Sequence, residues 1–161
     1  MPLWQIYHPY GTLEDDASKQ AFAQDITTMY TEMGLPAFYV VVQFFKMNDD
    51  NVFVGGTLRK SDQTPFVRIV INHIAIHVPD VDALYHRATS RIDQVVKPHV
   101  TDKGYDFEYH IDETERRLWK LNGMIPPPFK SQAEQLWAKE NRAITYDGAY
   151  PPTLEVSSSS G

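Results

Sequence analysis

Residues 2–7 read PLWQIY and residues 65–70 read PFVRIV, and these two stretches decide the fold. Each begins with proline and continues with apolar, aromatic or β-branched residues, a composition typical of a β-strand. Proline fits the first position of a strand, because its missing N–H interrupts no ladder hydrogen bond there. Each stretch is followed by a helical pattern and then by another strand pattern. The chain is therefore predicted to hold two consecutive β-α-β units.

The first unit contains two strand patterns around one helical pattern. A strand is predicted at residues 3–8, and an amphipathic helix at residues 11–33, which has an acidic beginning and apolar side chains at helical spacing. These apolar residues are Ala17, Phe22, Ile26 and Met29. The segment GLP ends the helix, because glycine tolerates a left-handed conformation and proline cannot continue a helix. FYVVVQFF at residues 38–45 is continuously apolar apart from one glutamine and predicts a strand buried on both faces.

The second unit repeats this order. It has a predicted strand at residues 65–74, a helix at residues 80–96 and a strand at residues 103–111. The helix carries apolar residues on one face, namely Val81, Leu84, Ala88, Ile92 and Val95. A helix that joins two parallel strands crosses over in the right-handed sense. Two such units predict a four-stranded sheet with both helices on one face.

The expected fold class is α/β, more narrowly α+β, with one domain at residues 1–147. Its halves are predicted at about residues 2–62 and 63–111, followed by a C-terminal extension. Two short helices of the extension are expected at residues 113–123 and 131–143. Residues 148–161 end in a low-complexity serine tract and are expected to be disordered.

Composition excludes several classes of function. The formal net charge is −6, which argues against a general nucleic-acid binder and against attraction to anionic lipid. The sequence contains no cysteine, so disulfides, thiolate nucleophiles and cysteine-ligated zinc are excluded. No apolar run approaches about 18 residues and no signal-peptide pattern opens the chain, so a cytoplasmic location without membrane contact is expected.

Pro2 allows two interpretations. As a strand residue it simply begins the first strand. If Met1 is removed, however, Pro2 becomes a secondary amine at the chain end and could act as a base. An α-amino group titrates near pH 8, and a desolvated pocket with cationic neighbours lowers that pKa towards neutrality. Such a base can move a proton between carbon and oxygen next to a carbonyl group.

Five segments together resemble a known family. They are PLWQIYHP, GLPAFYVVVQF, NVFVGG, KGYDFEYHIDET and LWKLNGMIPPP. The combination, which covers roughly residues 2–145, is similar to the fused, double-length branch of the tautomerase superfamily that contains cis-3-chloroacrylic acid dehalogenase. It resembles most closely the mostly fungal proteins called putative oxalocrotonate tautomerases. The resemblance implies a homotrimer, Pro2 as the catalytic amine, a small-molecule carboxylate substrate, and neither a metal nor an organic cofactor.

The other site residues of that branch are mostly replaced here. Its two substrate-binding arginines fall on Asn72 and Ala75, and its helix histidine falls on Tyr30. Its tyrosine on the last strand is retained as Tyr109, whereas its water-activating glutamate falls on Lys120. The resemblance therefore implies Pro2 and Tyr109 as catalytic residues. It makes dehalogenation doubtful, because that reaction needs a carboxylate to activate water.

Replacement cations lie close in the sequence. Arg68 is on the same face of its predicted strand as Asn72, because side chains alternate along a strand, and Lys120 is a further cation. Arg68 could hold a carboxylate through a bidentate fork. The candidate substrate-binding residues are Arg68, Asn72, Tyr30 and Lys120. Structural interpretations compete with these roles, namely Arg68 as a residue that lines the barrel of the trimer, Lys120 as a surface residue and Tyr109 as a strand-capping residue.

A metal site is not expected. His73 and His77 have HxxxH spacing, which brings ligands together on a helix but places them about 13 Å apart along extended chain. Two functions from different classes remain. One is a cofactor-free tautomerase-like isomerase that uses Pro2 for keto–enol proton transfer on a small unsaturated or keto acid. The alternative is a catalytically silent trimeric binding protein of the same fold, or a lyase of the hydratase or dehalogenase type.

Overall fold

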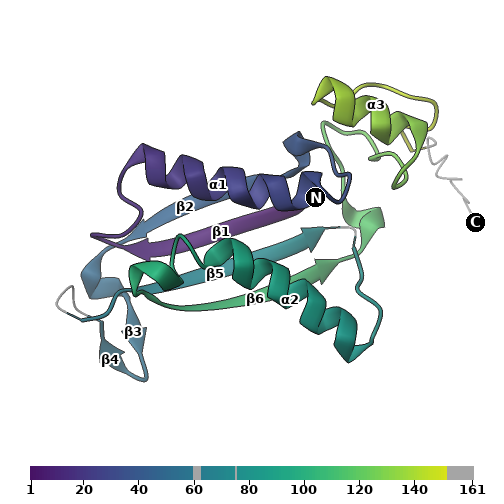
Figure 1. The fold of residues 1–161 in the computed structure, drawn as a ribbon. Coiled ribbons are helices and arrows are strands. Elements are labelled where there is room, and N and C mark those ends of the chain that lie inside the picture. The colour runs from purple at the N-terminus through teal and green to yellow at the C-terminus, as the bar shows by residue number, and fades with distance from the viewer. Residues whose placement is uncertain (60–62, 75, 152–161) are drawn as a thin grey trace, which may run out of the picture.

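The computed structural model describes residues 1–59, 63–74 and 76–151, and its centre is a four-stranded sheet (Figure 1). The strands lie in the order β2-β1-β5-β6. Their bounds are Pro2–Pro9 for β1, Val41–Met47 for β2, Phe66–Ile74 for β5 and Asp106–Thr114 for β6. β1 is parallel to β2 and β5 is parallel to β6, whereas the two central strands, β1 and β5, are antiparallel. The predicted pair of β-α-β units in one sheet is confirmed.

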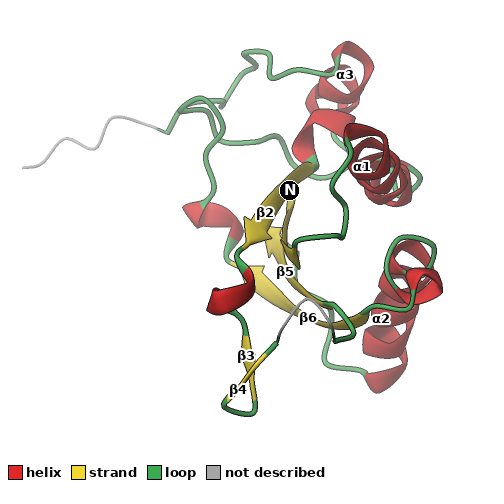
Figure 2. Ribbon diagram, turned by 90° about the vertical axis from the view of Figure 1, so that its left-hand side faces the viewer, coloured by secondary structure: helices red, strands yellow, loops and turns green. Residues whose placement is uncertain are grey.

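Both long helices cover the same face of this sheet, as Figure 2 shows. They are α1 (Asp16–Thr31) and α2 (Asp82–Val96). The side chain of Asp15 caps α1 by accepting a hydrogen bond from the Ser18 N–H at 2.7 Å. α1 buries one stripe of side chains, four residues apart, at Phe22, Ile26 and Tyr30. That spacing puts all three on one face of the helix, towards the sheet.

α2 is less buried than its sequence predicts. Ile92 and Val96 are buried near its C-terminal end, but Val81 and Leu84 at its beginning are 50% and 36% exposed. In Figure 1 the beginning of α2 lies beyond the β6 edge of the sheet, where no strand is available to cover it. The predicted apolar face is therefore correct only for the later turns of the helix.

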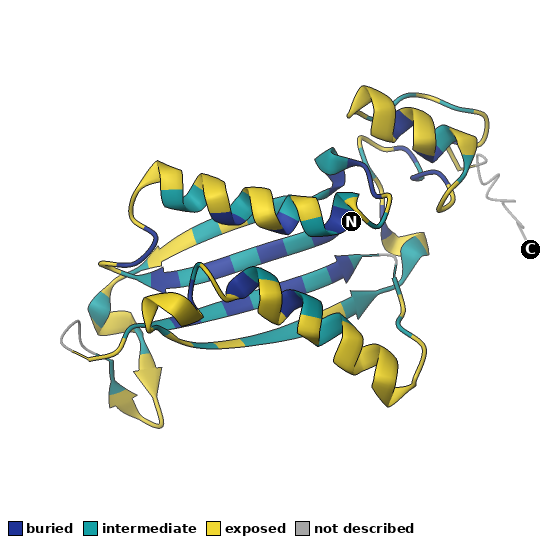
Figure 3. Cartoon of the chain, in the orientation of Figure 1, coloured by how far each residue is buried: buried dark blue, intermediate teal, exposed yellow. Residues whose placement is uncertain are grey.

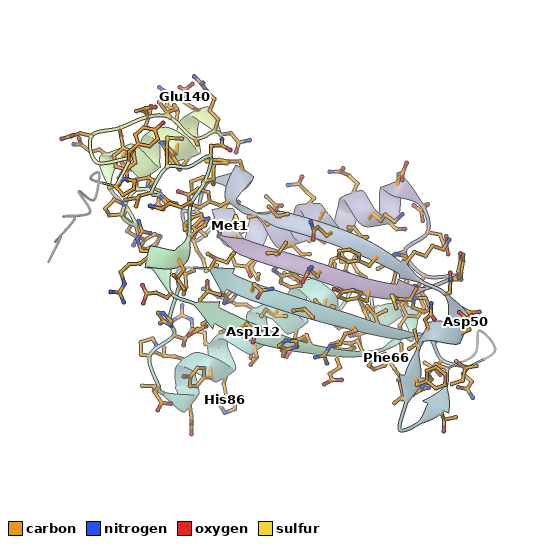
Figure 4. The ribbon with its side chains drawn as sticks, turned by 180° about the vertical axis from the view of Figure 1, so that it is seen from behind. Met1, Asp50, Phe66, His86, Asp112 and Glu140 are labelled. Atoms are coloured by element: carbon orange, nitrogen blue, oxygen red, sulfur yellow. The ribbon has the colours of Figure 1, made fainter. Side chains whose placement is uncertain are left out.

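Burial alternates along the two central strands (Figure 3). In β1 the residues Pro2, Trp4, Ile6 and His8 are buried, and the residues between them are half-buried. β5 alternates in the same way, with Val67, Ile69 and Ile71 fully buried. Because side chains alternate between the faces of a strand, the buried set faces the helices and the half-buried set faces the other side. Figure 4 views the molecule from that other side, where no long helix covers the sheet.

β2 differs from its prediction. The run at residues 38–45 was expected to form one strand buried on both faces, but it begins with the short 3-10 helix η1 (Ala37–Tyr39). β2 follows at the edge of the sheet, and none of its residues is buried. Beyond β2 the chain forms η2 (Asp49–Asn51) and a small hairpin of β3 (Phe53–Val54) and β4 (Thr57–Leu58). Another 3-10 turn, η3 (Thr101–Lys103), precedes β6.

The extension after β6 contains only one of the two short α-helices predicted for it. Residues 113–123 were expected to be helical, but β6 continues to Thr114 and only η4 (Arg116–Leu118) is helical. Asn122 and Gly123 both have positive φ, at 51° and 79°, and they form a tight turn that pairs Leu121 with Met124. Asn-Gly favours such a turn, which cannot belong to a helix. The predicted second helix is present as α3 (Gln132–Glu140).

The chain stays attached to the fold slightly beyond the predicted boundary at residue 147. Ala149 is buried, and its carbonyl accepts a hydrogen bond from the Ile125 N–H at 2.6 Å. Residues 152–161 of the predicted tail lie outside the described residues. Within the part of the chain that the structure describes, no helix is both long and apolar enough to cross a membrane.

Candidate active site

The N-terminus lies at the end of a central strand. Pro2 is buried and stands in register with His73 of β5. The pairing continues one residue beyond the strand, because the Met1 amine donates to the Ile74 carbonyl at 2.7 Å and the Ile74 N–H donates to the Met1 carbonyl at 2.8 Å. The two hydrogen bonds hold the chain end against β5. In Figure 4, Met1 lies where the sheet meets the C-terminal extension.

A cavity of about 390 Å³ opens beside Met1. Most of its lining is apolar, contributed by Met33, Leu35, Ile74, Ile76, Trp119 and Phe129. Four polar side chains also line it, namely Tyr39, His77, Arg116 and Glu134. These residues come from the end of α1, from η1, from the end of β5 and from the extension. A site of this shape, apolar with a few polar groups, is the usual form of a small-molecule pocket.

The Met1 amine shows what this environment does to a base. Burial lowers the pKa of the amine from 8.0 to about 5, since a charged ammonium loses its hydration there. Arg116 lowers the pKa further by charge repulsion, and Glu134 opposes both effects by attraction. An amine at this position is therefore neutral at pH 7 and able to accept a proton.

Arg116 is oriented by the backbone of the extension. Its Nη2 donates to the carbonyls of Pro126 and Pro127, at 2.5 and 2.8 Å. Prolines contribute carbonyls without N–H groups, so this PPP segment calls for donors from elsewhere. The two bonds fix a half-buried cation at the wall of the cavity.

Glu134 is a buried acid at the start of α3. Its side chain is 5% exposed and accepts a hydrogen bond from the Lys130 N–H at 2.6 Å, while its own N–H donates to the N-cap residue Ser131. This reciprocal arrangement resembles a capping box. Burial raises the pKa of Glu134, and the hydrogen bond from Lys130 and the positive charge of Arg116 oppose that shift.

Tyr39 has a buried hydroxyl without a partner. The residue is 2% exposed, and its hydroxyl has no hydrogen-bond partner among the described residues. Its ring meets Trp119 and Trp137 edge to face, with centroids 5.1 and 6.2 Å apart. Burial raises the pKa of Tyr39, so the hydroxyl keeps its proton and can only act as a neutral donor or acceptor.

Tyr30 lies near Pro2 but within the core. Its hydroxyl accepts a hydrogen bond from Trp4 Nε1 at 3.0 Å and lies 2.7 Å from Nε2 of His73, the residue in register with Pro2. Burial raises the pKa of Tyr30 and lowers that of His73, so both are neutral. The side chains of Trp4, Tyr30 and His73 pack together on the helix-covered face of the sheet, beside the start of β1. Tyr30 does not line the cavity beside Met1.

Asn72 and Arg68 lie on the sheet face that the helices leave uncovered. Asn72 is in register with Leu3, close to the N-terminus. Arg68 is four residues further along β5, about 13 Å away. It forms an ion pair with Glu108 at 2.7 Å and contacts Nδ1 of His110 at 2.6 Å.

Tyr109 and Lys120 are also not among the residues that line the Met1 cavity. The Tyr109 hydroxyl donates to Asp93 of α2 at 2.9 Å, and its strand position is level with Ile69. Lys120 is exposed in the segment after η4. In the single chain, none of Arg68, Tyr109 and Lys120 lines the cavity beside Met1. Ala75, the other aligned position, lies outside the described residues.

Sequence reasoning missed the polar residues that do line the cavity: Tyr39, Arg116 and Glu134. Tyr39 was hidden in an apolar run, and Arg116 and Glu134 were in segments expected to be short helices of the extension. The three prolines at 126–128 weakly indicate the position of Arg116, because their carbonyls need hydrogen-bond donors from another segment. Nothing in the sequence links these segments, which meet only through the fold.

The histidine pair does not form a metal centre in the described part of the chain. His73 is engaged with Tyr30, and His77 lies 3.4 Å from Glu113. Among the described residues, no group of three or more side chains has the arrangement to hold a metal ion.

Comparison with known protein families gives one match over most of the chain. The family with the description "Putative oxalocrotonate tautomerase enzyme" matches residues 1–142. A search of curated proteins finds no match.

Two solved structures are similar over nearly their full length. One is described as a probable enzyme from the thermophilic fungus Aspergillus fumigatus; it is 37% identical, with a TM-score of 0.80, over 91% of this chain and 98% of that one. The other, a mutant of RhCC from Rhodococcus jostii RHA1, is 36% identical, with a TM-score of 0.82, over 91% of this chain and 94% of that one. A fused 4-OT, described as an asymmetric trimer, is 20% identical, with a TM-score of 0.55 over 76% of this chain and 94% of that one, and shows the fold alone.

Proposed function

Because this chain belongs to the putative oxalocrotonate tautomerase family, we propose that it is a cofactor-free tautomerase-like isomerase. Pro2, after removal of Met1, acts as the general base for keto–enol proton transfer on a small unsaturated or keto carboxylic acid. One observation carries the proposal: the amine at the start of β1 borders a largely apolar cavity of about 390 Å³, where burial lowers its pKa.

Loss of Met1 changes the site in two ways. The free amine becomes the Pro2 nitrogen, which stands at the same end of β1. The Ile74 N–H, which donates to the Met1 carbonyl at 2.8 Å in the structure, becomes available to a ligand. A base and a backbone donor are then placed side by side at the edge of one cavity.

These two groups suffice for the isomerisation of an enol. The neutral Pro2 nitrogen takes the proton from the enol hydroxyl, and the negative charge is shared by the oxygen and the α-carbon, the far carbon of the enol double bond. The protonated amine then delivers a proton to that carbon, which yields the ketone and returns the base to its neutral form. A donor such as the Ile74 N–H stabilises the oxygen while it carries negative charge.

Assembly into a homotrimer is part of the proposal. The edge strand β2 has no buried residue, and Phe53 of the β3–β4 hairpin is 62% exposed. Apolar edges of this kind are normally covered by a neighbour. The trimeric fused 4-OT shows one way in which the fold assembles. In such a trimer the candidates for substrate contacts remain Arg68, Asn72, Tyr30 and Lys120. Tyr109 remains the candidate for a catalytic donor.

A lyase is the second candidate, and Glu134 is the observation that favours it. Hydration of an activated double bond needs a carboxylate to activate water, and the aligned position holds Lys120 instead. Glu134 brings a carboxyl group into the cavity from a different element.

We propose a cytoplasmic location for the protein, and the absence of cysteine from its sequence supports this proposal.

The test is the rate of ketonisation of phenylenolpyruvate, an enol that needs only one base and one proton donor. Protein whose intact mass shows the loss of Met1 is compared with Pro2→Ala, which keeps a primary amine at the terminus. We expect kcat/KM to fall roughly 100-fold in Pro2→Ala, the contribution of one positioned base. Rates no higher than that of the uncatalysed reaction in both proteins would favour the silent binding protein.

A further inference from the structure

The cavity beside Met1 holds two polar groups that are arranged for a ligand. We propose that Arg116 and Tyr39 form its carboxylate-binding part, and that the ligand is a monocarboxylate with an apolar tail. This inference rests on the proposed function and names the residues that select its substrate. The family resemblance assigns neither residue to a site.

Arg116 is an oriented cation whose charge acts on Glu134 of the same cavity without a direct ion pair among the described residues. A guanidinium has five N–H donors, and Nη2 gives its two to the carbonyls of Pro126 and Pro127. Three N–H groups, on Nη1 and Nε, remain beyond those two bonds. Within the described part of the chain, no carboxylate forms an ion pair with Arg116. A guanidinium fixed in this way suits a carboxylate from solution, which it can bind in a fork.

Tyr39 independently indicates a ligand. Its side chain is 2% exposed and lines the same cavity, yet its hydroxyl has no partner among the described residues. A buried hydroxyl without a hydrogen bond is unfavourable, so a ligand oxygen that accepts a hydrogen bond from it is stabilised. Arg116 and Tyr39 line the same cavity, so a ligand carboxylate bound there can contact both donors. The charges of Glu134 and Arg116 both act on the Tyr39 hydroxyl, and the effect of Glu134 is the larger.

The rest of the cavity selects the tail of the ligand. Met33, Leu35, Ile76 and Phe129 offer apolar surface, and Trp119 adds an aromatic face. A second carboxylate on the ligand would meet these apolar walls or the acid Glu134. Arylpyruvate-like acids therefore fit this lining better than dicarboxylates.

Arg68, the cation that the sequence favoured, is already engaged. It pairs with Glu108 at 2.7 Å and lies on the uncovered sheet face. The simplest competing role for Arg116 is structural, as a clamp on the Pro126–Pro127 backbone. A structural clamp and a carboxylate receptor differ in one measurable respect, because only the receptor distinguishes an acid from its neutral amide.

The experiment measures binding of 3-phenylpropionate, which cannot isomerise, to the full chain without Met1. Because Trp119 lines the cavity, tryptophan fluorescence should report binding. Calorimetry provides a second, independent measurement. The neutral isostere 3-phenylpropionamide is titrated alongside. The variants are Arg116→Gln, Arg116→Lys and Tyr39→Phe. The matched control is Arg117→Gln, whose arginine is next in the chain, 86% exposed and paired with Glu115.

We expect Arg116→Gln to weaken binding of the acid roughly 10- to 100-fold, and Tyr39→Phe about 3- to 10-fold. Binding of the amide should change less than about 2-fold in the arginine variants, and Arg117→Gln should leave both ligands unaffected. If Arg116→Gln does not fold, Arg116→Lys keeps the charge but loses the fork, and should weaken binding of the acid alone about 10-fold. Adipate, a dicarboxylate, should bind more weakly than 3-phenylpropionate.

Unchanged binding of the acid in the Arg116 variants would overturn the inference. An equal loss for acid and amide would also overturn it, since that result indicates a clamp. Pro2→Ala separates the two proposals, because it should bind 3-phenylpropionate like the wild type. Arg116-dependent binding without Pro2-dependent turnover would contradict the proposed function alone, and the reverse result would contradict this inference alone.

Discussion

Proline stands at the start of both central strands, but the two ends of the sheet differ in what they enclose. At one end, Met1, the residue before Pro2, borders a cavity of about 390 Å³. At the other end Pro65 precedes β5, and the cavity beside it holds only about 20 Å³. The carbonyl of Pro65 accepts a hydrogen bond from the Asp106 N–H at 2.9 Å, as an ordinary strand residue would.

The difference arises from what covers each end. At the Pro2 end, η1, η4 and α3 form a cover that leaves a largely apolar space over the strand. At the Pro65 end, the segment around η2 and Arg59 closes the space, and Arg59 reaches Asp106 at 3.5 Å. A proline that begins a strand is thus a structural feature of the repeat. It offers chemistry only where its nitrogen can become an amine and where a cover keeps the surroundings dry.

A form that keeps Met1 should show the largest loss of activity. Its Pro2 nitrogen is an amide without a basic lone pair, and the Met1 side chain occupies the cavity wall. We expect kcat/KM with phenylenolpyruvate to fall about 1,000-fold, within the range for loss of a general base. Intact mass identifies the form. Full activity would instead assign the chemistry to the primary amine of Met1, whose pKa of about 5 leaves it neutral.

Trp137→Ala should remove the cover of the Pro2 end. Trp137 is fully buried, packs on Tyr39 and Phe38, and donates to the Ile144 carbonyl at 2.7 Å. Its loss should lower the free energy of unfolding by about 3–5 kcal/mol and reduce activity as well. Urea unfolding measures the first effect. Leu136→Ala is the control on the same helix, 45% exposed, and should change stability by less than about 0.5 kcal/mol. Equal effects of the two changes would show that α3 is only loosely attached.

Pro65→Ala should have the smallest effect on activity. The Pro65 nitrogen is an amide and its cavity is too small for a substrate. We expect kcat/KM to stay within about 2-fold of the wild type, measured with the same enol, while the free energy of unfolding changes by less than about 1 kcal/mol. A loss as large as that in Pro2→Ala would break the distinction between the two ends.

The sequence sufficed for the sheet because its signals are local. Alternation along β1 and β5 and the helical spacing of Phe22 and Ile26 on α1 are set by residues within a few positions of one another, although Tyr30 is buried on that stripe in place of the predicted Ala17 and Met29. The extension was harder, since Asn122 and Gly123 form a turn where a helix was expected. The charged residues at 113–117 and the mostly apolar residues at 118–121 are compatible with a helix as well as with a turn.

The sequence predicted only one part of the candidate site, the amine at the start of β1. That prediction rests on Pro2, which becomes a secondary amine if Met1 is removed. Tyr39, Arg116 and Glu134 meet from three separate segments, and no periodicity connects them. The resemblance directed attention to Arg68 and Tyr109, and in this chain Glu108 and Asp93 contact those side chains. Their part in a trimer stays a prediction.

The central claim is that Pro2 is a base whose pKa is lowered by its cavity. The most direct test is a titration of the Pro2 nitrogen by NMR, in protein labelled with ¹⁵N-proline and free of Met1. An ordinary α-amino group titrates near pH 8. Burial and Arg116 lower the pKa of the amine at this end of β1 and Glu134 partly opposes them, so the Pro2 pKa should lie well below that value.

The neutral amine is the active form, so kcat/KM should be low at acid pH and rise through the same pKa. Agreement between the NMR titration and the kinetic midpoint, both clearly below pH 8, is the result that the account predicts. A Pro2 pKa at or above the ordinary value, or activity that does not follow it, would contradict the account.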